Sequence, residues 1–258
     1  MLIPIGDDDR GLTRPAFATY AFVIANVVVF VGLQGCRSDN SFSYGHAAIP
    51  FEIVHGVDLL EPVAIQYGGE QVLVPNARGP RPIYLTLLTS LFLHGSLVHL
   101  FGNMLYLWIF GDNIEHRFGL LPFVGLYLVG GVLGSVMQIA LDPSSAIPVL
   151  GASGAVSSVM GAYLVLYPRN RVHALFFVFV ISLPAAVVIG LWIGFQVLQG
   201  WGTLSTAGDV PGGVAYAAHV GGFATGALAA AVERLRRPAE RDNILSRASS
   251  ADGSRRYW

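Results

Sequence analysis

The amino-acid sequence predicts an all-α membrane protein, a bundle of six membrane-spanning helices. Hydrophobic residues make up 53% of the 258 residues and charged residues only 12%, which is about half the charged share of an ordinary soluble domain. The charges are also segregated, so that several uncharged tracts approach the roughly 20 apolar residues that a helix needs to cross a bilayer. The net charge of -1 gives no indication of nucleic-acid binding.

Six segments, taken in chain order, fit membrane helices. The second needs a boundary, because residues 83–111 form an uncharged tract longer than one crossing requires. We expect the part before His94-Gly95-Ser96 to lie in the membrane interface and Ser96 to cap the spanning part. The fourth helix is short and rich in Gly, Ala and Ser. The predicted helices are residues 16–33, 97–111, 118–141, 152–167, 173–199 and 214–232.

The placement of arginines predicts the topology. They precede the first helix and follow the second, fourth and sixth, whereas the opposite side holds only Arg37, Arg78 and Arg81. The positive-inside rule therefore places both termini in the cytoplasm. The first helix could instead be a cleaved signal sequence, which would leave five spans. We expect a cytoplasmic N-terminus (1–15), a membrane domain (16–234) with an external loop (35–82), and a disordered cytoplasmic tail (235–258).

Four polar side chains inside the predicted spans point to a functional site, because such groups are costly in a membrane. His99 and Asn103 lie four residues apart and so on one helix face. Ser153 opens the fourth helix, and His219 lies in the sixth. Asn103, Ser153 and His219 lie 14, 16 and 15 residues before the next cytoplasmic arginine. At about 1.5 Å of rise per residue, all three reach a similar depth, below the outer membrane surface.

Small residues recur at four-residue spacing in the fourth and sixth helices, which allows close approach of membrane helices. If the two stripes face each other, Ser153 and His219 lie near the outer end of one contact, where an imidazole could activate the hydroxyl. Each residue also has a simpler interpretation: a packing serine, a structural histidine, and an interhelical clamp of His99 with Asn103. The stripes are Gly154, Ser158 and Ala162, and Ala218, Gly222 and Gly226.

Three motifs, in this order and spacing, resemble the rhomboid family of intramembrane serine proteases. They are HGSLVHLFGN at residues 94–103, GASGA at 151–155, and AHVGGFATG at 218–226. The resemblance extends from about Tyr84 to Arg234 and implies the six-helix rhomboid bundle. The three motifs together are specific, whereas the GxSG motif alone is not.

The resemblance also implies roles for individual residues. Ser153 and His219 would form a catalytic dyad without an acidic third member. The Ser153 backbone N–H, His99 and Asn103 would line the oxyanion hole. The residues that would support this site are His94, which would brace a nearby loop, and Gly151 and Gly154 beside the nucleophile.

Two departures from the family pattern concern the surroundings of the site. Leu85-Thr86 stand where many members have a Trp-Arg pair, so the external loop could be anchored differently. Ser157 stands where many bacterial members have a tyrosine that packs on the catalytic histidine. We therefore expect another group, such as Tyr216 or Phe223, to orient His219.

The predicted partners are single-pass membrane proteins and the lipid bilayer. We expect substrate to enter beside the fifth helix, weakened in its middle by Pro184, with Trp192 and Phe195 packed at its outer half. A plain lipid-facing helix is the alternative. No metal or cofactor is expected, since the single cysteine, Cys36, belongs to no Cys/His cluster.

Two other functions compete with proteolysis. A relative without activity that binds membrane proteins should lack Ser153 or His219, and this sequence has both. A transporter should carry ionisable residues at several depths, whereas here they concentrate at one. The predicted location is the bacterial inner membrane.

Overall fold

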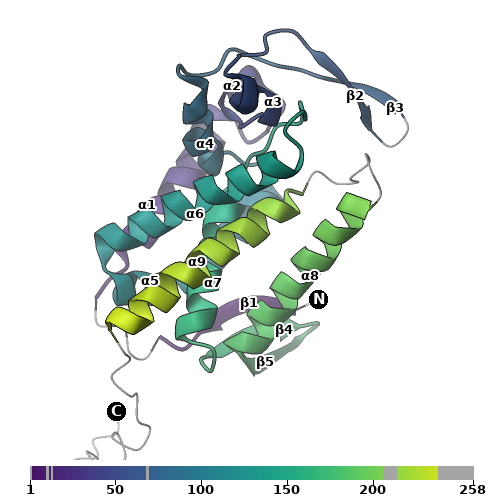
Figure 1. The fold of residues 1–258 in the computed structure, drawn as a ribbon. Coiled ribbons are helices and arrows are strands. Elements are labelled where there is room, and N and C mark those ends of the chain that lie inside the picture. The colour runs from purple at the N-terminus through teal and green to yellow at the C-terminus, as the bar shows by residue number, and fades with distance from the viewer. Residues whose placement is uncertain (1, 10–11, 13, 68–69, 206–213, 238–258) are drawn as a thin grey trace, which may run out of the picture.

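The structure is a computed structural model, and it describes residues 2–9, 12, 14–67, 70–205 and 214–237. Long helices run side by side through its centre, and short elements cover the two ends (Figure 1). One end carries a hairpin of β2 Val63–Tyr67 and β3 Glu70–Val74 with two short helices, and the other carries a three-stranded sheet. The fold is therefore mostly helical but not purely so.

A helix forms at each of the six predicted positions. The second helix begins at Leu97, as predicted, and its Ser96 cap accepts a hydrogen bond from the His99 N–H at 3.1 Å. It also runs seven residues beyond the predicted end at Gly111. The helices are α1 Phe17–Val28 with its continuation η1 Val29–Leu33, α5 Leu97–Phe118, α6 Leu120–Leu141, α7 Ser153–Leu166, α8 Ala185–Ser205 and α9 Tyr216–Arg236.

The number of these helices that cross a membrane is a separate question. Among the described residues, two helices are by themselves long and apolar enough, Leu120–Leu141 and Ala185–Gly202. A third candidate is the bent pair Ile83–Phe92 and Leu97–Phe118, whose two parts meet at 79°. Phe17–Leu33 and Ser153–Leu166 are apolar but shorter. The six-span topology therefore stays a prediction.

The predicted fifth span, residues 173–199, is wrong in its first half. Strands β4 Arg171–Phe176 and β5 Phe179–Pro184 pair there as an antiparallel hairpin, and α8 begins only after Pro184. β-Branched and aromatic residues favour strands, and proline disrupts a helix interior. The predicted role of Pro184 is therefore wrong: it precedes the fifth long helix and does not weaken its middle. Loop carbonyls of Pro168 and Asn170 accept hydrogen bonds from the first N–H groups of α8.

The N-terminal segment forms a strand, where the sequence predicts only a cytoplasmic N-terminus. Strand β1, Leu2–Asp7, pairs antiparallel with β4, from Leu2 opposite Phe176 to Asp7 opposite Val172, with a register shift between Pro4 and Gly6. The sheet order is β1-β4-β5. This strand pairing corrects the all-α prediction, because it joins two segments that lie far apart in the sequence.

The predicted external loop 35–82 contains two short helices and a two-stranded hairpin. Its Ala48 forms an isolated bridge with Val149, which holds the loop against the segment that precedes α7. The predicted tail lies mostly outside the described residues, although α9 extends through Arg236. The short elements are α2 Ser41–His46, α3 Pro50–His55, β2 Val63–Tyr67 and β3 Glu70–Val74, followed by η2 Ile83–Leu85, α4 Thr86–Thr89 and η3 Ser90–Phe92.

The core forms around α7, which packs against α6 and α9 and is buried continuously from Gly154 to Tyr163. The predicted small-residue stripes do meet. A Cβ added at Gly222 would overlap the Gly154 carbonyl, and one added at Gly226 would overlap the Ser158 carbonyl. Both overlaps are with backbone, so α7 and α9 approach each other closely at positions where only glycine fits.

Candidate active site

The nucleophile candidate Ser153 is the first residue of α7, and Gly151 shapes the turn before it. Gly151 has a φ of 130°, which an L side chain rarely adopts. A Cβ at this position would lie 2.7 Å from His99 Cε1 and 3.0 Å from His99 Nε2, and 3.6 Å from Ser153 Oγ. The His99 ring and the Ser153 hydroxyl thus approach the same point, which only a glycine leaves open.

Hydrogen bonding orients the His99 ring. Its Nδ1 accepts a hydrogen bond from the Gly95 backbone N–H at 3.3 Å. A neutral imidazole whose Nδ1 accepts carries its proton on Nε2. His99 therefore presents an N–H donor on the side that faces Gly151.

Asn103 lies one turn further along α5 and is only 7% exposed. Its Nδ2 is buried and has no hydrogen-bond partner among the described residues. A buried amide donor without a partner is costly in a folded protein. It is therefore available to a group that arrives later, such as a substrate oxygen. No contact between Asn103 and Ser153 appears among the described hydrogen bonds.

His94 lies in the segment before α5 and is fully buried, and neither nitrogen of its ring has a hydrogen-bond partner among the described residues; its bracing role stays a prediction. Gln34, at the end of η1, accepts a hydrogen bond from the His94 backbone N–H at 2.8 Å and donates one to its carbonyl at 3.1 Å. The His94 ring meets the His99 ring edge to face, with centroids 5.2 Å apart. Gln34 was not anticipated, although a polar residue directly after the first apolar tract was a visible signal.

His219 lies on α9 at the level of Ser153. The Ala218 carbonyl oxygen lies 3.5 Å from the position of a Cβ on Gly154, so the two helices touch between the two candidate residues. The His219 side chain is 9% exposed, and its Nδ1 lies 2.8 Å from Oε1 of Gln196 on α8. In the described part of the chain, no hydrogen bond joins His219 to Ser153. The dyad therefore stays a prediction.

Aromatic side chains surround the His219 ring. Trp192 of α8 lies 5.8 Å from it between centroids, and Tyr216 lies edge to face at 6.5 Å. The expected contact with Tyr216 is thus present, whereas no ring contact with Phe223 occurs among the described residues. Ser157, at the position of the family tyrosine, donates to the Ser153 carbonyl at 2.6 Å. Gln196 is a functional candidate that the sequence motifs do not include, although a polar residue in a predicted span is a visible signal.

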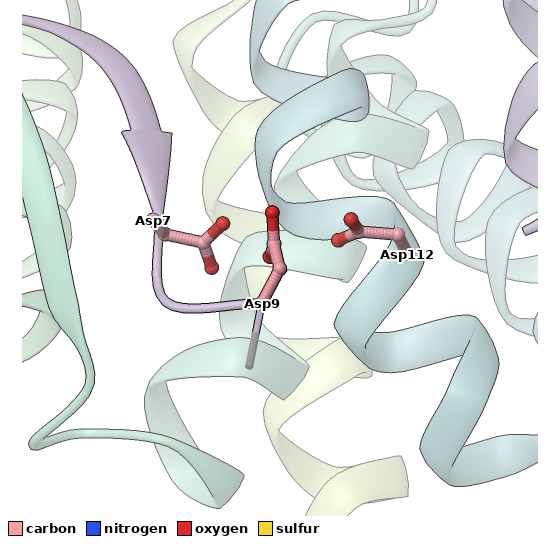
Figure 2. A group of neighbouring side chains, drawn as sticks. All are labelled: Asp7, Asp9 and Asp112. Atoms are coloured by element: carbon pink, nitrogen blue, oxygen red, sulfur yellow. The ribbon is translucent and has the colours of Figure 1, made fainter. Parts of the chain in front are cut away.

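A second polar cluster lies at the far end of α5, near the sheet. Figure 2 shows the carboxylates of Asp7, Asp9 and Asp112 close together, with ligand atoms within 4.8 Å of one another, a spacing that could hold a metal ion. The Asn113 side-chain amide donates to all three, at 3.1, 3.0 and 3.3 Å. The three carboxylates thus share the Asn113 amide as a hydrogen-bond donor. These bonds connect the N-terminal segment, which carries Asp7 and Asp9, to α5.

Burial raises the pKa of Asp7 to about 8, a hydrogen bond from the Tyr163 hydroxyl opposes this rise, and the neighbouring Asp9 adds to it. The charged form of this carboxyl is therefore disfavoured in the folded protein. The cluster lies apart from Ser153, at the opposite end of α7, where Tyr163 reaches it.

The fold and the site together define a helical membrane protein with serine and histidine side chains gathered near one end of its helices. The sequence matches the rhomboid domain over residues 82–236, which is more than half of the chain. The chain belongs to the rhomboid family. This family is known for intramembrane serine proteases.

Curated relatives come from several kinds of organism. RHOMBOID-like protein 4 of Arabidopsis thaliana is 34% identical over 218 residues, which cover 80% of this chain and 50% of the relative. Rhomboid protein 1, mitochondrial, of Saccharomyces cerevisiae is 32% identical over 148 residues, 56% of this chain and 40% of the relative. Rhomboid protease GluP of Bacillus subtilis is 32% identical over 145 residues, which cover 56% of this chain and 25% of the relative. The chain thus spans half or less of these relatives.

Proposed function

We propose that this protein is an intramembrane serine endopeptidase that cleaves the membrane helices of single-pass proteins through a dyad of Ser153 and His219. The observation that carries the proposal is the backbone contact of α7 with α9 one residue from each member of the dyad, where the Ala218 carbonyl meets Gly154. Membership of the rhomboid family supports the same reaction class.

The first chemical step forms the acyl-enzyme. The Ser153 hydroxyl attacks the scissile carbonyl carbon while His219 Nε2 takes the hydroxyl proton. His219 then gives this proton to the leaving amine as the peptide bond breaks. Water next attacks the ester, again with His219 as base, which releases the acid product and restores the Ser153 hydroxyl.

The oxyanion that forms at the attacked carbonyl needs donors. The Ser153 backbone N–H lies in the first turn of α7, where N–H groups have no partner within the helix. His99 Nε2–H and the unpartnered Asn103 amide are the further donors. In soluble serine proteases one such donor is worth about 10²–10³ in rate. No metal or cofactor takes part in this mechanism.

Substrate access is proposed along α8. Phe195 is 53% exposed on this helix, whereas Trp192 is turned inward against the rings of His219 and Tyr106. Six crossings with both termini in the cytoplasm would place the site beneath the outer surface. The relatives come from a plant, from yeast mitochondria and from a bacterium, so the bacterial inner membrane stays a prediction.

The experiment is cleavage of a panel of model membrane helices with small residues and helix-breaking sequences, by purified protein in detergent and in liposomes. We expect product from the wild type and none from Ser153→Ala or His219→Ala, with all three proteins equally folded by circular dichroism. Equal product from all three would exclude the dyad. If the wild-type protein binds the model helices without cutting them, the result would favour the alternative, a protein that binds membrane proteins without protease activity.

A further inference from the structure

We infer that Gln196 of α8 is the positioning residue of the catalytic histidine and takes the place that the acidic residue holds in a three-membered serine protease site. This inference rests on the proposed function. No Asp or Glu lies at the depth of Ser153 in any of the predicted helices, and the family resemblance implies no acid for this role. The amide of Gln196 reaches the nitrogen of His219 that the dyad does not use.

The orientation assigned to the Gln196 amide, with Oε1 toward the ring, assigns the proton of neutral His219 to one nitrogen. Its Nδ1 lies 2.8 Å from the Gln196 side-chain oxygen Oε1. A carbonyl oxygen can only accept a hydrogen bond, so Nδ1 must donate. In a neutral imidazole the proton on Nδ1 leaves a lone pair on Nε2, which is the form that can accept the serine proton.

Both side chains of this hydrogen bond are buried, so losing it would leave a polar group without a partner. Gln196 is 7% exposed and His219 is 9% exposed. A polar side chain at this depth of an apolar helix is costly unless it finds a partner, and each of these two satisfies the other. The rest of α8 nearby is apolar or outward-facing, with Phe195 and Val197 both about half exposed. In this turn of α8, the position that faces His219 is therefore occupied by the polar residue Gln196 and not by an apolar one.

A neutral amide suits this place better than a carboxylate. A charged acid beneath the membrane surface would need desolvation, whereas an amide oxygen accepts the same N–H without a net charge. When His219 becomes an imidazolium during the reaction, the dipole of the amide still stabilises the proton on Nδ1. The amide therefore supplies orientation and tautomer, and only part of the electrostatic stabilisation that an acid would give.

The test uses full-length protein with three substitutions: Gln196→Leu, Gln196→Glu and the control Gln199→Leu. The control removes an exposed glutamine three residues further along the same helix. For each variant, kcat and KM are measured with one cleaved model helix, together with the labelling rate of Ser153 by a serine-directed fluorophosphonate. The pH profile of kcat is recorded for the wild type and for Gln196→Glu.

We expect Gln196→Leu to lower kcat and the labelling rate by about tenfold or more, the factor that losing one buried hydrogen bond predicts, with little change in KM. Gln199→Leu should match the wild type. In Gln196→Glu a carboxylate still accepts from Nδ1, so activity should persist and the acid limb of its pH profile should move to higher pH. Among the described residues, the titratable groups that interact with His219 are His99 and Tyr216, and Tyr106 lies beyond the Trp192 ring; all three are unchanged in these variants.

Several results would overturn the inference. One is a Gln196→Leu variant within twofold of the wild type, and another is an equal loss in Gln196→Leu and Gln199→Leu. If Gln196→Leu does not fold, an unshifted pH profile in Gln196→Glu would still count against the role. A wild type whose labelling and cleavage do not exceed those of Ser153→Ala would refute the proposed function, and the positioning role with it.

Discussion

The contact between α7 and α9 makes a quantitative prediction about Gly226. A Cβ at this position would lie 2.8 Å from Ser158 Cα and would overlap the Ser158 carbonyl. Both atoms belong to backbone, so no side-chain rotation relieves the overlap, and the Gly226→Ala variant must move the two helices apart. The same helices carry Ser153 and His219, which makes this packing important for the site.

The magnitude follows from two opposing effects. Overpacking a well-packed core costs about 1–3 kcal/mol, and the backbone overlap favours the upper part of that range. Alanine has a better helix propensity than glycine by about 1 kcal/mol. The net loss should therefore be about 2 kcal/mol, which lowers the melting temperature by roughly 4–8 °C for a protein of this size.

The matched control is Gly190→Ala in α8, where an added Cβ meets nothing within 4 Å. This variant keeps the gain in helix propensity without the overlap, so it should melt at or above the wild-type temperature. Unfolding in detergent is followed by circular dichroism, because the exposed thiol of Cys36 would react with a thiol-specific dye before unfolding. If Gly226→Ala melts as high as Gly190→Ala, the close approach of α7 and α9 is wrong.

Two further predictions concern the oxyanion donor and the N-terminal strand. Asn103→Ala should lower kcat by about 10²–10³ while the circular dichroism spectrum stays unchanged; a fully active variant would exclude Asn103 from the oxyanion hole. The pKa of Asp7 rises from 3.8 to about 8 on burial, so the folded state holds a proton that the unfolded state has lost between these values. Its stabilising contribution is full below pH 4 and is lost as the pH rises toward 8. Amide hydrogen exchange in β1, measured relative to Asp7→Asn at each pH, should therefore become faster over this range, and equal pH dependence in both proteins would contradict the raised pKa.

The parts of the fold that were predicted correctly depend on local sequence. Ser96 predicts the start of α5. The four-residue spacing that includes Gly222 and Gly226 predicts which face of α9 packs closely against another helix. Polar atoms in apolar tracts identified Ser153 and His219 as candidates for the same reason: each is unusual in its own segment. None of these predictions needed knowledge of distant contacts.

The parts that failed depend on contacts between distant segments. An apolar tract does not distinguish a buried strand from a membrane helix, so the sequence wrongly predicts a span over residues 173–184, although Pro184 marks the boundary. β1 forms a strand because it pairs with β4, which lies far away in the sequence. The residues of Leu2–Asp7 do not by themselves predict that pairing. Gln196 could have been singled out as a polar group in a spanning tract, but only the fold reveals that His219 is its neighbour.

The pairing of β1 with β4 has a consequence for the order in which the molecule is completed. Leu2 leaves the ribosome early, whereas its partner Phe176 is synthesised only after α7. The first strand is therefore without this partner until the helices α1 to α7 have been synthesised, and its pairing completes the sheet late. A bulky affinity tag placed directly before Leu2 would sit beside this closing strand, so a tag placed after α9 is the better choice for producing the protein.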